Sequence, residues 1–206
     1  LYDDEDFEHM FLDESRVAAK IQHENVAKIL ALGTTDDLLY IVMEWVDGET
    51  LSTIQQAARD GGMSFPNAVL LRIAAETAAG LHAAHELKDD AGHSLDLVHR
   101  DMSPANVLIS RTGVVKIVDF GIAKSKGRLH VTRASGMVKG KTPYLSPEQI
   151  GGLGIDRRSD LFSLGVLLYV LATGKHPFRG ETEIQKRSEN SGDQREQRAA
   201  HNASSA

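Results

Sequence analysis

The chain has 206 residues, 41% of them hydrophobic and 25% charged, which is typical of a globular domain that buries a core. Its formal net charge of −6 argues against a nucleic-acid partner, which would need a basic surface. Because the sequence has no cysteine, disulfides and thiolate metal sites are excluded and a cytoplasmic protein is favoured. The most apolar stretch, residues 161–174, is shorter than the roughly 20 residues that cross a bilayer, so no membrane segment is expected.

Apolar spacing in the first half of the chain predicts a helix, a hairpin and two further helices. Apolar side chains recur at helical spacing over residues 6–22, and two apolar runs within residues 25–46 flank a turn, which indicates a β-hairpin. Residues 47–62 predict a turn and a short helix that ends at two glycines. Residues 66–87 form the longest helical pattern, with Pro66 in its first turn.

The second half predicts a small hairpin, a long loop, a buried helix and an unfolded end. Residues 106–110 and 114–120 are short β-type runs joined by a glycine-containing turn. Residues 121–143 are rich in glycine, hydroxyl and basic residues, which favours a long mobile loop. Residues 159–178 predict a buried helix that begins at Ser-Asp and stops at glycine. Residues 185–206 contain no large apolar side chain, so they are expected to be disordered.

Two short motifs place acidic and amide side chains at spacings that suit phosphate chemistry. In the run H-R-D-x-x-x-x-N, Asp101 precedes Asn106 by five positions, so one oxygen can meet a substrate hydroxyl and another a metal ion. An Asp-Phe-Gly run starts at Asp119, directly after an apolar strand, where its carboxylate would suit Mg²⁺. Each motif alone also fits an ordinary turn, because Asp, Asn and Gly are turn residues, but their order and spacing together indicate function.

These motifs and the segments around them resemble the protein kinase family over residues 11–180. The segment "VHRDMSPANVLI" is similar to its catalytic loop, "KIVDFGIAK" to its metal-binding loop and "GKTPYLSPEQ" to the end of its activation segment. The segments are most similar to bacterial Ser/Thr kinases of the eukaryotic type. The resemblance implies an α+β, two-lobed fold with an incomplete small lobe at 1–46, a mostly helical large lobe at 47–184 and a polar disordered tail at 185–206.

The resemblance also implies roles for individual residues in an ATP- and Mg²⁺-dependent transfer to Ser or Thr hydroxyls of a protein. Asp101 would orient the substrate hydroxyl or accept its proton, and Asn106 and Asp119 would hold Mg²⁺ on the ATP phosphates. Around the nucleotide, the family places a gatekeeper, which corresponds to Met43, and a hinge that bonds the adenine, which corresponds to Glu44 to Val46. It also places an apolar floor under the adenine, which corresponds to Leu108, and an ion-pairing glutamate, which corresponds to Glu14.

Regulation and the phosphate contact involve further residues. By the same resemblance, Arg100 would answer a phosphate on the activation segment, where Thr132 and Ser135 are the candidate acceptors. Ser103 stands where Ser/Thr kinases of this family carry a lysine that reaches the γ-phosphate, and Lys141 stands where they carry a threonine. We therefore expect Lys141 to supply the charge that Ser103 cannot; the alternative is a lysine that faces solvent.

The ends of the sequence depart from the family pattern. No Gly-rich loop or ATP-gripping lysine precedes Glu14, and the sequence turns polar soon after Phe178. We therefore expect a domain truncated at both ends, and weak or inactive by itself, since phosphotransfer relies on positioning and electrostatics. Glu14 and Glu148 are then expected to lack charged partners. A longer parent protein could add a sensor domain or a dimer contact.

Other functions stay open from the sequence. A pseudokinase-like binding module without phosphotransfer fits the missing lysine, but not the intact Asp101, Asn106 and Asp119. A small-molecule phosphotransferase of related fold is disfavoured by the Ser-Pro-Glu run and the long loop before it. Tyrosine specificity is disfavoured but open, because the lysine marker is absent. His82 and His85, three positions apart on a predicted helix, are assigned to packing rather than to a metal.

Overall fold

The computed structural model describes residues 4–35, 38–120 and 142–178. Most of the predicted loop at 121–143 and the whole predicted tail at 185–206 lie outside these ranges. The division of the chain at residue 46 into two lobes stays a prediction. None of the helices within the described ranges is long and apolar enough to cross a membrane.

The first part of the fold is a helix followed by a two-stranded sheet. Helix α1 (Asp4–Ala18) precedes β1 (Ile29–Thr35) and β2 (Leu38–Met43), which pair antiparallel. The predicted helix and hairpin are therefore confirmed, but the helix ends earlier than residue 22. Ile21 lies after the helix and is still buried, so its apolar side chain extended the helical pattern beyond the helix itself.

A second, three-stranded sheet forms beside the first. Strands β3 (Gly48–Thr50), β4 (Val107–Ser110) and β5 (Val115–Ile117) pair antiparallel in that order. The β4–β5 hairpin is the one that the sequence predicts. Strand β3 was expected to be a turn, because three residues are too few to show an alternating pattern. It is a strand because its backbone pairs with β4, which lies far away in the sequence.

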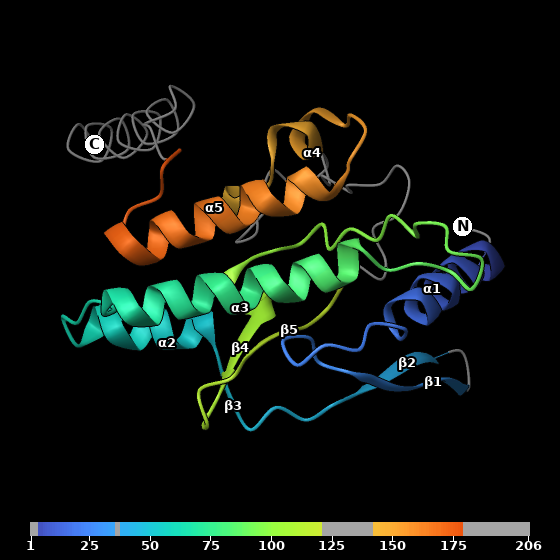
Figure 1. The fold of residues 1–206 in the computed structure, drawn as a ribbon, viewed down its shortest axis with the longest axis horizontal. Helices are drawn as coiled ribbons and strands as arrows, with labels where there is room; N and C mark the ends of the chain where they lie inside the picture. Colours follow the sequence, from blue (N-terminus) through green and yellow to red (C-terminus); the bar gives the residue numbers. More distant parts are fainter. Residues whose placement is uncertain (1–3, 36–37, 121–141, 179–206) are drawn as a thin grey trace, which may run out of the picture.

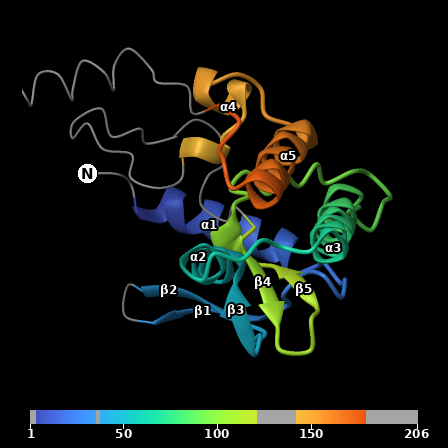
Figure 2. The ribbon, with the colours of Figure 1, turned by 90° about the vertical axis from the view of Figure 1, so that its left-hand side faces the viewer.

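Four helices of the described residues follow the first sheet in the chain. Helices α3 and α5 run side by side and antiparallel, with α2 next to the three-stranded sheet and α4 near the start of α5 (Figure 1 and Figure 2). Helix α5 begins before the predicted Ser159, because the Asp156 side chain caps it by accepting a hydrogen bond from the Arg158 backbone N–H. The helices are α2 (Leu51–Asp60), α3 (Asn67–His85), α4 (Pro147–Gly151) and α5 (Arg157–Thr173).

One apolar core lies between α2, α3, α5 and the three-stranded sheet. Met102, Val107 and Leu167 in this core are at most 1% exposed. Burying a side chain of this size contributes about 1.5–3 kcal/mol relative to exposure. Because Met102 and Val107 flank the segment from Ser103 to Asn106, the core fixes both ends of that segment. The other fully buried apolar side chains of the core are Leu51, Ile73, Leu81, Ala84, Val115 and Ile117.

The segment between α1 and β1 is attached directly to α3 and β5. Asn25 Nδ2 donates to Val115 O at 2.9 Å and to Glu76 Oε2 at 3.2 Å. A Cβ atom on Gly80 would lie 2.8 Å from Asn25 O, so only glycine lets α3 approach this segment so closely. The small sheet and α1 therefore connect to a firm base on α3 and β5.

Candidate active site

Asp101 and Asn106 lie together in the loop that precedes β4. A 3₁₀ turn (Pro104–Asn106) brings the asparagine back to the aspartate, and Asn106 Nδ2 donates to Asp101 O at 2.8 Å and to Asp101 Oδ2 at 3.2 Å. Both residues are buried. Because the amide nitrogen is used by Asp101, the amide oxygen of Asn106 stays available as a ligand for a cation.

His99 holds this loop against the end of β5. Its Nε2 lies 2.9 Å from Val118 O and its Nδ1 accepts the Asp101 N–H at 3.2 Å, which sets the proton on Nε2. The ring packs on Phe120 with centroids 4.7 Å apart. Burial lowers the pKa of His99 despite nearby acidic groups, so the ring is neutral. His99 therefore both packs on Phe120 and makes two ring hydrogen bonds.

Asp160 anchors the same loop from α5. Its carboxylate accepts the backbone N–H groups of His99 and Arg100, each at 2.8 Å, and lies 2.8 Å from His85 Nε2. Asp160 is 1% exposed. The sequence indicates only that Asp160 lies near the start of a helix, and it does lie in the first turn of α5. Its role as an anchor was missed, although a carboxylate in a buried helix was an available signal, since a buried charge needs several partners.

The backbone is strained at two points of the site. Arg100 and Asp119 have φ values of 64° and 57°. Such a left-handed conformation costs a non-glycine residue of order 1–3 kcal/mol and persists only where surroundings enforce it. At Arg100 the surroundings include Asp160 on the backbone N–H and Gln149 Nε2, which donates to the Arg100 carbonyl at 2.8 Å. Sequence reasoning missed Gln149.

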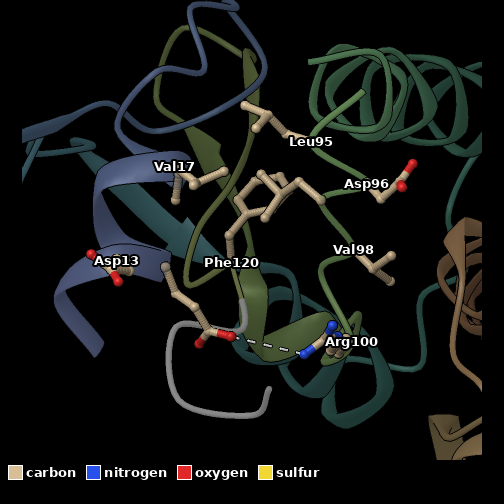
Figure 3. Close-up of a pocket in the computed structure, with 10 residues that line it drawn as sticks. Asp13, Val17, Leu95, Asp96, Val98, Arg100 and Phe120 are labelled. Carbon is tan, nitrogen blue, oxygen red and sulfur yellow. Dashed lines mark ion pairs between the residues drawn. The ribbon is translucent and has the colours of Figure 1, made fainter. Parts of the chain in front are cut away.

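Glu14 has a partner within the described part of the chain. Arg100 Nη1 lies 4.0 Å from Glu14 Oε1, across a cavity of about 220 Å³ between α1, residues 95–100 and Phe120 (Figure 3). The expectation of an unpaired Glu14 is therefore wrong. The Arg100 guanidinium, which was expected to bind a phosphate, faces the Glu14 carboxylate here. A carboxylate carries a negative charge, as a phosphate does. The proposed acceptors of that phosphate, Thr132 and Ser135, lie outside the described residues.

The side chain of Glu44 fixes the predicted hinge by hydrogen bonds to neighbouring segments. Glu44 N donates to Lys28 O at 2.8 Å, and the Glu44 carboxylate accepts from Lys28 N at 3.1 Å and from Lys116 Nζ at 2.9 Å. Burial would raise the pKa of this carboxyl, but the Lys116 and Lys28 hydrogen bonds outweigh burial and lower it.

Two polar groups of the hinge backbone are available to bind a ligand. Among the described residues, no hydrogen bond uses the Glu44 carbonyl or the Val46 N–H. Met43 ends β2 next to this hinge, and Leu108 lies half-buried in β4. A free carbonyl followed two residues later by a free N–H suits the edge of a heterocyclic base.

Ser103 is a buried hydroxyl in need of a partner. It is 5% exposed, and its Oγ makes no hydrogen bond with the described residues. Lys141, its expected counterpart, lies outside the described residues. An unpaired buried hydroxyl costs about 1–3 kcal/mol, so a ligand or side chain that bonds it would be favoured.

The oxygen ligands near Asp101 fit a magnesium ion. Val118 N donates to Asn106 O at 3.0 Å, which places Asp119, the next residue and an exposed one, beside Asn106. Within the described ranges no three His, Cys, Asp or Glu side chains gather in one metal-binding cluster. An ion held by one amide and one carboxylate would complete its shell with water and phosphate oxygens, as Mg²⁺ commonly does.

Glu148 is bonded by a neutral hydroxyl, so its expected lack of a charged partner stays a prediction. Ser159 Oγ donates to its carboxylate at 2.5 Å. This bond is the main reason why the pKa of Glu148 is lowered. A hydroxyl from α5 therefore stabilises the charge for which a distant arginine was expected.

Comparisons with known proteins agree with this geometry. The family description "Protein kinase domain" matches residues 2–205. The chain is 46% identical over 179 residues to the tyrosine-protein kinase MasK of Myxococcus xanthus, covering 87% of this chain and 28% of MasK. It is 36% identical to the Ser/Thr kinase PrkC of Bacillus subtilis, covering 88% of this chain and 26% of PrkC. The chain thus spans about a quarter of these relatives' length.

Solved structures give the same result for the fold. The crystal structure of the PknI kinase domain of Mycobacterium tuberculosis matches with a TM-score of 0.63 and 28% identity. The match covers 85% of this chain and 60% of the PknI chain.

Proposed function

Because this chain belongs to the protein kinase domain family, we propose that it serves the transfer of the γ-phosphate of ATP to Ser or Thr hydroxyls of a protein substrate. One observation carries the proposal: Asp101 and Asn106 are bonded to each other, and Asp119 lies beside them. A carboxylate for the acceptor hydroxyl and two oxygen ligands for Mg²⁺ are the parts that phosphotransfer needs. We place this activity in the cytoplasm, where ATP is available.

The residues would divide the work between acceptor and nucleotide. Asp101 would orient the acceptor hydroxyl and take its proton. Asn106 and Asp119 would hold Mg²⁺, which neutralises charge on the phosphates when it is bound. The Glu44 carbonyl and the Val46 N–H would bond the edge of the adenine.

The apolar side chains would complete the nucleotide site. Leu108 would pack against the face of the adenine ring. Met43 would close the back of the adenine site as its gatekeeper. Both roles rest on the family resemblance and on the position of these residues beside the hinge and in β4.

The direct test is transfer of labelled phosphate from Mg·ATP to a generic protein substrate, with EDTA as a control. Nucleotide binding can be followed separately, because the sequence has a single tryptophan, Trp45, which is 87% exposed and next to the hinge. We expect Trp45 fluorescence to change when Mg·ATP is added. Labelled protein should form in the absence of EDTA and not in its presence. Binding without transfer would instead favour a binding module.

We also propose that Lys141 supplies the phosphate-contacting charge that Ser103 cannot. The support is the exchange of residue types between the two positions and the unpartnered, buried Ser103 Oγ. Lys141→Ala is expected to lower kcat by about 10²-fold, the cost of losing one electrostatic contact to the transition state. Lys175→Ala, which removes the same charge from an exposed site after α5, is the matched control and should leave kcat unchanged. Unchanged turnover in Lys141→Ala would contradict the exchange.

Tyrosine is a second candidate acceptor. The first observation in its favour is that serine replaces the lysine typical of Ser/Thr kinases at position 103. The second is the name of MasK as a tyrosine-protein kinase. Acid hydrolysis of the labelled substrate separates phosphoserine and phosphothreonine from phosphotyrosine, and phosphotyrosine alone would replace the Ser/Thr proposal.

A further inference from the structure

Gln149 links α4 to the peptide that precedes Asp101 by a hydrogen bond. Its Nε2 donates to Arg100 O at 2.8 Å, and its side chain is buried, with 3% exposed. The carbonyl of Arg100 belongs to the same peptide unit as the N–H of Asp101. Its direction therefore helps to set the direction of the Asp101 backbone.

The peptide between Arg100 and Asp101 is held at both ends. The Asp101 N–H is bonded to His99 Nδ1 at 3.2 Å, and the Arg100 carbonyl is bonded to Gln149. Asp160 holds the preceding peptide through the Arg100 N–H. Since Arg100 is left-handed, with φ of 64°, this peptide would turn toward a more relaxed direction if one bond were removed.

The orientation of Gln149 is fixed by its other contacts. Its Oε1 accepts the Ser146 backbone N–H at 3.0 Å and the Ser146 hydroxyl at 3.2 Å. These donors require the oxygen at that end, and the Arg100 carbonyl requires the NH₂ at the other, so the amide has one consistent orientation. The capping box of α4 thereby holds a hydrogen-bond donor rigidly against the catalytic loop.

The segment that carries Gln149 is itself fastened to α5. Ser163 Oγ donates to Tyr144 O at 2.7 Å, and Ser159 Oγ bonds Glu148. Gln149 therefore extends from a segment that is bonded to α5. Its hydrogen bond to Arg100 O connects the catalytic loop to this fixed segment.

We propose that Gln149 is a positioning residue for Asp101, which couples α4 to the catalytic loop. This inference rests on the proposed phosphotransfer, since it explains how the carboxylate keeps its direction during that reaction. It differs from a simple capping role, in which Gln149 would stabilise α4 alone.

Two variants of the full-length protein separate the two roles. Gln149→Glu keeps an acceptor for Ser146 but loses the donor to the Arg100 carbonyl, and Gln149→Met loses the donor without adding charge. Ser146→Ala is the matched control, because it removes the hydroxyl of the cap while the Ser146 backbone N–H still orients the Gln149 amide toward the Arg100 carbonyl. For each we would measure kcat, KM for ATP, the melting temperature, and amide hydrogen exchange of residues 97–106.

We expect both Gln149 variants to lower kcat by roughly tenfold or more, because small misplacements of a reacting group are costly, while KM for ATP stays unchanged. Exchange in residues 97–106 should become faster. Ser146→Ala should lower the melting temperature and leave kcat unchanged. Unchanged kcat in the Gln149 variants, or an equal loss in Ser146→Ala, would overturn the inference. If the wild-type protein transfers no phosphate, the proposed function fails, and the exchange comparison alone decides whether Gln149 holds the loop.

Discussion

The two carboxylates of the site differ in environment, and the difference suits two roles. Asp101 is 9% exposed and bonded by Asn106, whereas Asp119 is exposed and has a φ of 57°. A buried carboxylate with a fixed direction suits proton transfer from one positioned hydroxyl. An exposed carboxylate can meet a hydrated cation without first being uncovered. Burial therefore supports the proposed assignment of base and metal ligand, in addition to motif order.

The role of Asp101 predicts a loss of transfer without a loss of binding. Asp101→Asn keeps the size of the side chain and removes its ability to take a proton. We expect phosphate transfer to fall by about 10²–10⁴-fold, the range of general-base contributions, while Mg·ATP still changes Trp45 fluorescence with similar affinity. Asp60→Asn, at the exposed end of α2, is the matched control and should change neither. A variant that loses binding and transfer together would argue for a structural role of Asp101.

At the scale of elements, the sequence predicted those that carry their own local pattern. The β1–β2 and β4–β5 hairpins and α3 were found because alternation, helical spacing and turn residues lie within each segment. Strand β3 was missed, since its only evidence is its pairing with β4.

The same distinction applies to the site. Asp101, Asn106 and Asp119 belong to short motifs, whereas Asp160 and Gln149 act on the catalytic loop from distant helices. The spacing of residues within a short segment cannot predict hydrogen bonds between segments that are far apart in the sequence. The Glu14–Arg100 pair was missed for the same reason, because it joins α1 to a loop far along the chain.

Without Asp160, helix α5 should lose its hydrogen bonds to the backbone of His99 and Arg100 in the catalytic loop. Asp160→Ala leaves one buried and one partly buried backbone N–H group, and His85, without their acceptor, so we expect the free energy of unfolding to fall by about 3–5 kcal/mol. Asp156→Ala, at the cap of the same helix, is the control and should cost about 1 kcal/mol. Urea unfolding of the two variants beside the wild type measures both. Similar losses from both would show that Asp160 acts as an ordinary helix residue.

At the scale of the whole molecule, His99 connects the parts that meet around the site. Its ring nitrogens bond the end of β5 and the catalytic loop, its ring packs on Phe120, and its backbone N–H is held by α5. A proton on Nδ1 would remove the acceptor for Asp101 N–H and add charge to a fully buried ring. Acid should therefore weaken the fold through this one residue before it neutralises the carboxylates.

The sign of this effect follows from the pKa of His99, which burial lowers from its ordinary value of 6.5. The unfolded chain then takes up a proton that the folded chain does not, so stability is complete above pH 6.5 and falls as the pH decreases below it. The slope is at most about 1.4 kcal/mol per pH unit for one proton. Glu44 and Glu76 also have lowered pKa values, and their contribution is lost only below 4.5. Urea unfolding between pH 5 and 7.5 therefore avoids the titration of these carboxylates, and His99→Gln, which keeps a donor for Val118 O, should flatten the profile. An equal slope in this variant would assign the pH dependence to other groups.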